Sequence, residues 1–158
     1  MICFLGLEES KTREREIFAL QNLFSEAQAS QIFEKTISQI QNIQAIFNTG
    51  IERNQLDQTI VGWFAPKKRH GRQCMGHIYI GENYRHQGFG LNALLAFKKK
   101  NPGLLWYADQ DHPASQYLAK RAGLTLIGEE ETEIGRWKVF EDLQEGMKTK
   151  ICLILSKS

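Results

Sequence analysis

A glycine-containing loop near the middle of the chain carries the residues best suited to chemistry. Its sequence is Arg85-His86-Gln87-Gly88-Phe89-Gly90, between an apolar run at 77–80 that predicts a strand and an amphipathic run at 91–99 that predicts a helix. The first amide N–H groups of a helix have no partner within the helix, and the helix dipole makes that end positive. Gly88 and Gly90 let a ligand approach the backbone closely, and Arg85 supplies a charged fork. The loop therefore predicts a pyrophosphate-binding site.

The part of the chain before this loop predicts helices set between strands. Apolar residues at helical spacing indicate one helix over 10–24 and a second that begins at Ser25 and runs to about Ile40. Short runs rich in β-forming residues predict strands over 1–7, 43–50, 59–65 and 73–80. The basic stretch at 66–72 separates the last two strands, so we expect a hairpin with a solvated basic turn.

The part of the chain after the loop alternates between helices and strands. The helix over 91–100 is stopped by Asn101-Pro102-Gly103, and a short apolar strand over 104–108 follows, buried on both faces. A further helix starts at Asp111-His112-Pro113 and ends at Gly123. We expect a strand at 124–127, an acidic turn at 128–133, a strand or loop at 136–140 and a final strand at 148–155. The central strand–helix–strand unit favours a parallel pair, hence an α/β fold.

Length and composition limit the class of protein. The chain has 158 residues and a net charge of +2, so we expect one domain over 1–158 and no affinity for nucleic acid. No apolar run reaches the roughly 18 residues that a membrane helix needs, and the apolar start at 1–7 lacks the basic leader of a secretory signal. Three widely spaced cysteines form neither a disulfide framework nor a metal pattern. We therefore expect a cytoplasmic protein without a metal.

Two blocks of sequence together resemble the GNAT superfamily of N-acetyltransferases. The run from Arg85 to Gly90 fits the family signature Arg/Gln-x-x-Gly-x-Gly/Ala, and 111–124 resembles the later helix of the family. The blocks lie at the separation that the family has, with one strand between them. The resemblance implies a mixed, mostly antiparallel sheet with a splayed parallel pair and helices on both faces.

The activity that the resemblance implies is transfer of an acetyl group from acetyl-CoA to a primary amine by direct attack. The amine would belong to a small molecule, a peptide or a protein, and the resemblance leaves room for a homodimer. Pantetheine would pair with the strand that ends at Ile80 and would form a hydrogen bond with His112. The diphosphate would bind beside Arg85, to the backbone amides of Gln87, Gly88, Phe89, Gly90 and Leu91.

Departures from the family pattern concern the proton transfers. The strand positions that hold a base in many relatives are Gly76 and Cys74 here, and the position of the tyrosine acid is Ala119. The resemblance leaves Ser115 as the residue that faces the sulfur of CoA, and His112 as a second catalytic candidate that could accept a proton. Weaker candidates for the base are His77, Glu82 and Asp109.

Two other functions fit parts of the sequence. Gly88-x-Gly90-x-x-Ala93 matches the dinucleotide-binding string, and Asp109 follows at about the distance of a ribose ligand. Against this, residues 81–87 separate the strand from its first glycine, and too few residues follow for a six-stranded doubly wound sheet. The second alternative is a module of the same fold that binds acyl-CoA or a macromolecular partner without turnover.

Overall fold

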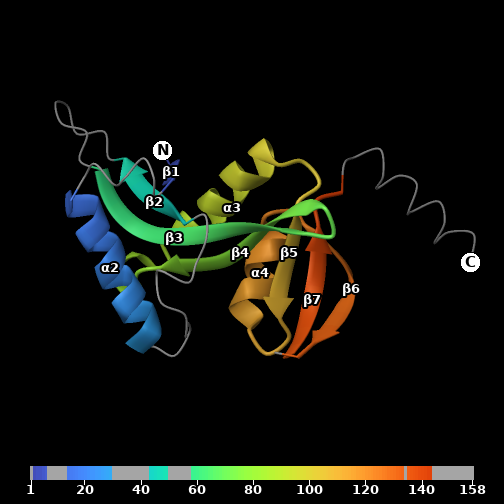
Figure 1. The fold of residues 1–158 in the computed structure, drawn as a ribbon. Coiled ribbons are helices and arrows are strands. Elements are labelled where there is room, and N and C mark those ends of the chain that lie inside the picture. The colour runs from blue at the N-terminus through green and yellow to red at the C-terminus, as the bar shows by residue number, and fades with distance from the viewer. Residues whose placement is uncertain (1, 7–13, 30–42, 50–57, 134, 144–158) are drawn as a thin grey trace, which may run out of the picture. The chain divides into compact units, whose positions relative to one another are not determined.

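The computed structural model describes residues 2–6, 14–29, 43–49, 58–133 and 135–143 (Figure 1). None of the helices in these ranges combines the length and the apolar character needed to cross a bilayer. Along the chain, the elements are β1 (Ile2–Gly6), α2 (Glu14–Ala29), β2 (Gln44–Thr49), β3 (Gln58–Arg69), β4 (Arg72–Ile80), the 3-10 turn η2 (Glu82–Tyr84), α3 (Phe89–Lys100), β5 (Leu105–Asp109), α4 (Pro113–Arg121), β6 (Thr125–Thr132) and β7 (Gly135–Glu141).

The sheet is mixed, as the sequence predicts. In order of hydrogen-bonded neighbours the strands run β1-β2-β3-β4-β5-β7-β6. The pairs β1 with β2, β2 with β3, β5 with β7 and β6 with β7 are antiparallel. β4 and β5 are parallel, with Cys74 opposite Leu105. The predicted parallel pair in a mostly antiparallel sheet is therefore confirmed.

The described residues form two compact units. The first takes its residues from 1–67 and 75–96, and contains β1, α2, β2, most of β3 and β4, η2 and the start of α3. The second takes its residues from 68–74 and 97–158, and contains the tip of the β3–β4 hairpin, the end of α3, β5, α4, β6 and β7. The single domain over 1–158 stays a prediction.

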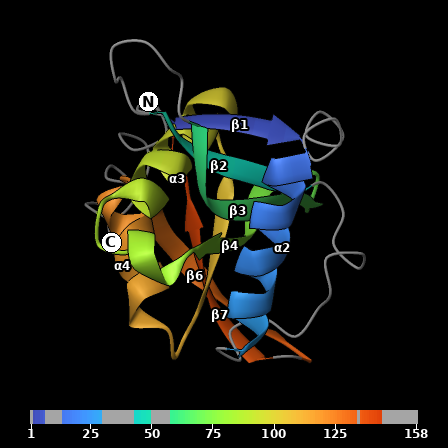
Figure 2. The ribbon, with the colours of Figure 1, turned by 90° about the vertical axis from the view of Figure 1, so that its left-hand side faces the viewer.

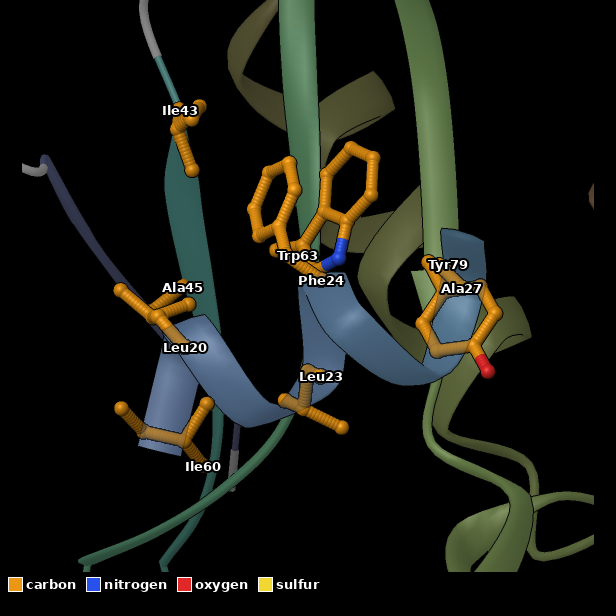
Figure 3. Packing of buried hydrophobic residues seen from close by; sticks show 9 residues of the cluster. All are labelled: Leu20, Leu23, Phe24, Ala27, Ile43, Ala45, Ile60, Trp63 and Tyr79. Atoms are coloured by element: carbon orange, nitrogen blue, oxygen red, sulfur yellow. The ribbon is translucent and has the colours of Figure 1, made fainter. Parts of the chain in front are cut away.

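The core of the first unit lies between α2 and the strands. Phe24 of α2 stacks on Trp63 of β3, with ring centroids 4.3 Å apart (Figure 3). Val61 and Phe64 are also buried but lie outside this cluster, which fits a sheet covered on its second side. Figure 2 shows α2 and the start of α3 on opposite sides of β2 and β3. The cluster under α2 consists of Leu20, Leu23, Phe24, Ala27, Ile43, Ala45, Ile60, Trp63 and Tyr79.

The first described helix does not break at Ser25, so the predicted start of a second helix there is wrong. The Ser25 hydroxyl donates to the carbonyl oxygen of Gln21 at 3.0 Å, one turn earlier. Serine can satisfy its hydroxyl inside a helix in this way and need not cap a new one. The predicted helix beyond Ala29 and the predicted strand over 148–155 lie outside the described residues.

The β3–β4 hairpin is confirmed, but the predicted basic turn at 66–72 is too long. β3 ends at Arg69 and β4 begins at Arg72. The turn between them consists of His70 and Gly71, with φ of 51° and 74°. Two consecutive residues with positive φ match the twist of paired strands and close a hairpin without a longer loop. Within the second unit Arg69 pairs with Glu130, while Arg72 pairs with Glu141 at 2.6 Å.

The acidic segment at 128–133 is not the predicted turn, because β6 continues through it to Thr132. Its partner β7 resolves the predicted ambiguity at 136–140 in favour of a strand. Glu129 lies opposite Lys138, and Glu131 lies opposite Arg136. Cross-strand pairs of opposite charge stabilise a sheet, so a run of glutamates can remain in a strand here. A register shift between Leu126 and Gly128 interrupts the ladder.

A half-buried tyrosine, a carboxylate and an arginine meet in the second unit. Arg69 lies over the Tyr107 ring, 4.2 Å from its centroid, and also pairs with Glu130. Burial, together with the charge of Glu130, raises the pKa of Tyr107 to about 12. Burial also opposes the charged form of Glu130. The hydrogen bond from Tyr107 and the charge of Arg69 outweigh that effect and hold the pKa of Glu130 below 4.5.

Glu130→Gln is expected to reduce the free energy of unfolding at pH 7 by roughly 1 kcal/mol. Because the pKa of Glu130 is lowered on folding, its contribution is complete above the unfolded value of 4.5 and is lost as the pH falls through the folded value. The difference between wild type and variant should therefore shrink below pH 4.5 in urea titrations. Glu133→Gln, at an exposed position, is the matched control. A difference that stays constant with pH would contradict this account.

Phe24→Ala is expected to reduce the free energy of unfolding by about 3–5 kcal/mol, because it empties the site that stacks on Trp63. The control is Phe18→Ala on the same helix. The Phe18 side chain is 65% exposed, against 3% for Phe24. Chemical denaturation of both variants measures the contrast, and equal losses would show that α2 does not pack as described.

Candidate functional site

The loop between β4 and α3 is built from short turns. At its start the Gly81 N–H donates to the Val61 carbonyl oxygen at 2.9 Å, which extends the contact with β3 by one residue. η2 follows, closed by a bond from the Tyr84 N–H to the Gly81 oxygen at 2.8 Å. His86 then has a φ of 62° and Gly88 a φ of 83°. These left-handed residues turn the chain from the strand into the first turn of α3.

The start of α3 has the features of an anion site. The Asn92 N–H donates to the Gly88 oxygen at 2.9 Å, so Gly88 is the N-terminal cap. In the part of the chain that the structure describes, no group accepts a hydrogen bond from the backbone N–H groups of residues 88–91. Four donors at the positive end of a twelve-residue helix can bind a phosphate.

Glycine at position 88 is required by the backbone more than by space. A Cβ atom there would meet only Nδ2 of Asn92, at 3.8 Å. The φ of 83° is nevertheless one that residues with a side chain rarely adopt. A cap without a side chain also leaves the N–H groups of the first turn without a side-chain acceptor from that residue.

Arg85 is directed back to the strand that precedes the loop. Its Nε donates to the Ile80 carbonyl oxygen at 3.1 Å, and its Nη2 donates to the Tyr79 hydroxyl at 3.1 Å. Nη1 lies 3.8 Å from a carboxylate oxygen of Glu82. The guanidinium therefore joins the two ends of the loop, and it holds the backbone carbonyl at which the resemblance expects pantetheine to pair.

The predicted diphosphate-binding residues lie together in the first unit. Gln87, Gly88, Phe89, Gly90 and Leu91 form one continuous turn at the start of α3. The Gln87 side chain donates to the Asn83 oxygen at 3.0 Å, which ties the second half of the loop to the first. η2 separates β4 from Gly88, so the tight strand-to-helix turn of a dinucleotide fingerprint is not formed here.

The two predicted catalytic residues lie together in the second unit, at the start of α4. The Ser115 N–H donates both to the His112 carbonyl oxygen, at 3.1 Å, and to its Nδ1, at 3.3 Å. His112 is thus the N-cap, and Nδ1 acts as the acceptor. The Ser115 Oγ accepts a hydrogen bond from Nε1 of buried Trp106 at 3.2 Å. This bond orients the hydroxyl and leaves its own hydrogen available to donate.

The other residues considered for proton transfer differ in exposure. Ala119 and Cys74 are fully buried, which fits packing. Tyr117 is 62% exposed, and the Arg121 guanidinium lies 5.9 Å from its ring centroid. His77, Glu82 and Asp109 are exposed, and Asp109 accepts a hydrogen bond from the Asp111 N–H at 2.9 Å. Among the described residues, no group of three His, Cys, Asp or Glu could hold a metal ion.

Sequence reasoning missed one carboxylate at this loop. Glu26 of α2 accepts hydrogen bonds from the Tyr79 hydroxyl and the Glu82 N–H. It stands in a helix among other polar residues, and no motif marks it. Only the packing of α2 on the strands brings it to the end of β4.

Comparison with known proteins identifies the fold. No family model and no curated protein matches the chain. A GNAT-family acetyltransferase from Bacillus anthracis matches with a TM-score of 0.60 and 12% identity, over 89% of this chain and 92% of that one. NAA60 of Arabidopsis thaliana, solved with acetyl-CoA, matches with a TM-score of 0.55 and 11% identity, over 89% and 97%.

A third match is the microcin C7 self-immunity acetyltransferase MccE, solved with acetyl-CoA and AMP. It matches with a TM-score of 0.52 and 18% identity, over 65% of this chain and 61% of that one. At such identities a likeness shows the fold alone. The chain has the fold of the GNAT acetyltransferases, which confirms the fold that the sequence blocks predict.

Proposed function

We propose that this protein transfers an acetyl group from acetyl-CoA to a primary amine. The observation that carries the proposal is the run of N–H donors at residues 88–91, for which the described part of the chain supplies no acceptor, at the start of a helix in a GNAT fold. Similar solved structures support the same ligand: two of them, MccE and NAA60, contain acetyl-CoA, and MccE and the Bacillus anthracis protein are named as acetyltransferases. The acceptor amine belongs to a small molecule, a peptide or a protein.

The diphosphate of CoA binds to the amides of Gln87 through Leu91. Its charge is balanced by the helix dipole and by the N–H groups, which need no reorganisation to receive it. Arg85 contributes positive charge beside this turn while its Nε and Nη2 hold Ile80 and Tyr79. Pantetheine pairs with the edge of β4 near Ile80.

The reaction is direct attack of a neutral amine on the thioester carbonyl carbon. The new C–N bond forms as the C–S bond breaks, the amine gives up a proton, and the thiolate of CoA takes one. Ser115 is the residue proposed to donate to the departing sulfur. Its Oγ is held by the Trp106 indole, so its hydrogen can point elsewhere. Positioning of the two reactants supplies a large share of the rate.

His112 is better suited to hold pantetheine than to act as the base. Its Nδ1 already accepts from the Ser115 N–H, so the hydrogen of the neutral ring is on Nε2. That tautomer can donate to a carbonyl oxygen of pantetheine. To accept a proton from the amine, Nδ1 would have to release the Ser115 N–H, because Nε2 already carries a hydrogen.

A second candidate function is a binding module of the same fold that performs no turnover. The observation that favours it is the burial of Ala119 and Cys74 at positions where relatives carry an acid and a base. Thiol release from acetyl-CoA over a panel of amines and peptides separates the two functions. CoA binding without release on any acceptor would favour the module, and binding of NAD instead of CoA would overturn both.

Cellular location and assembly complete the proposal. We place the protein in the cytoplasm, since its cysteines lack the spacing of a disulfide framework and Cys74 is a buried free thiol. Neither a membrane nor a nucleic acid is a proposed partner, and a homodimer is compatible with the proposal.

Gly88→Val is expected to weaken CoA binding by at least about a hundredfold. A β-branched residue is strained at a φ of 83°, and its side chain also crowds the diphosphate turn. Gly71→Val is the matched control, because Gly71 has a φ of 74° and lies in the hairpin turn, where a Cβ atom would have no neighbour within 4 Å. Calorimetric titration of both folded variants with CoA measures the contrast. Equal CoA affinities of the two variants would show that the diphosphate does not bind at this turn.

Ser115→Ala is expected to lower kcat by about a hundredfold, the size typical of a lost general acid. The affinity for CoA should stay within about threefold of wild type, because the backbone of α4 and its His112 cap are retained. Steady-state thiol release gives kcat, and equilibrium titration gives the affinity. An unchanged kcat would exclude Ser115 from the mechanism.

A further inference from the structure

Glu26 connects α2 to the loop that precedes α3. Its Oε1 accepts a hydrogen bond from the Tyr79 hydroxyl at 2.7 Å and a second one from the Glu82 N–H at 2.6 Å. Tyr79 is the penultimate residue of β4, and Glu82 is the first residue of η2. One carboxylate oxygen therefore spans the point where the strand gives way to the loop.

The contact continues from Tyr79 to Arg85 at the far end of η2. The Tyr79 hydroxyl accepts from Nη2 of Arg85 while it donates to Glu26. The same guanidinium lies over the Tyr79 ring, 5.3 Å from its centroid. We use the name carboxylate clamp for Glu26, Tyr79, Glu82 and Arg85. The hydrogen bonds among these four residues hold the segment 79–85 together.

The residues of the carboxylate clamp are anchored in the packed interface between α2 and the strands. Tyr79 is 4% exposed and belongs to the core cluster under α2, and Figure 3 shows its hydroxyl pointing away from Trp63. A Cβ atom on Gly81 would lie 2.6 Å from Cδ2 of Leu23, so α2 packs directly against the start of the loop. A buried hydroxyl and the first N–H of a helical turn both need an acceptor, and Glu26 supplies one atom to both.

We propose that Glu26 is a positioning residue for CoA binding, and that it acts by fixing the loop that carries the diphosphate-binding amides. This inference rests on the proposed function. Residues 86–88 connect the clamp to the start of α3, so a loop held at 79–85 restricts where the N–H groups of residues 88–91 can lie. Preorganised donors bind an anion more tightly, because less conformational freedom is lost on binding.

The clamp also changes the role expected of Arg85. Its Nε and Nη2 are used within the protein, on Ile80 and Tyr79. Glu26 keeps the tyrosine hydroxyl in place as the acceptor for Nη2. Removal of Glu26 is therefore expected to loosen Arg85 and the loop together, although Glu26 itself touches no phosphate in this proposal.

The test compares three variants of the full chain by calorimetric titration with CoA. Glu26→Ala removes the acceptor and should weaken binding by about tenfold, the loss expected for hydrogen bonds to a charged group. Glu26→Gln keeps an oxygen that can accept both bonds and should stay within about threefold of wild type. Asn22→Ala, at an exposed position one turn earlier on α2, should bind as wild type does.

A second readout needs no ligand. In two-dimensional amide spectra of the free protein, Glu26→Ala should shift the signals of Gly88 and Gly90, and Glu26→Gln should leave them near their wild-type positions. Tyr79→Phe keeps the buried ring and removes the hydroxyl. It should weaken CoA binding by about threefold, and it takes the place of Glu26→Ala should that variant fail to fold.

The outcomes separate this inference from the function on which it rests. Equal CoA affinity in wild type and Glu26→Ala, with unchanged glycine signals, would overturn the inference and leave the proposed function standing. A Gln variant as weak as the Ala variant would also overturn it, because the acceptor atom would not be what matters. Absence of CoA binding by the wild-type protein would overturn the proposed function, and the inference with it.

Discussion

A helix cannot pair its own first N–H groups, and that constraint dominates the loop before α3. Gly88 caps the helix through its carbonyl oxygen alone and offers no side chain to the donors that follow. Its positive φ directs the chain into the helix without a longer connection. Within the described ranges, nothing accepts a hydrogen bond from the N–H groups of residues 88–91, and an anion would satisfy both these donors and the dipole behind them.

The surrounding structure serves to hold that turn in one place. In the first unit, the stack of Phe24 on Trp63 fixes α2 to the strands, and α2 brings Glu26 to the end of β4. The bond from the Gly81 N–H to Val61 sets where the strand ends. In the second unit, the same principle operates at Ser115, whose hydroxyl and N–H are both held by groups of the protein. Packing of apolar residues thus determines where the polar groups stand.

The fold and the left-handed turn that starts α3 were predictable from sequence because short-range rules govern them. Gly88, the strand before it and the helix after it lie within one stretch of chain, and Pro113 marks the start of α4 in the same local way. The glutamates of β6 were wrongly predicted as a turn, since their strand depends on basic partners in β7 that a local pattern does not show. Glu26 could not be found either, because its contacts are with residues more than fifty positions away.

The edge strand β6 of the described sheet has a consequence for behaviour at high concentration. β6 ends the order of strands, and it exposes Leu126 and Ile127 next to a row of carboxylates. A bare strand rim that carries aliphatic groups invites neighbouring molecules to add themselves to it. Charged side chains at Glu129 and Glu131 make this edge a poor partner for another strand, and the bulge near Gly128 breaks the flat template that such addition needs. By this reasoning, substitutions that remove the acidic residues of β6 are expected to make the protein more prone to aggregate.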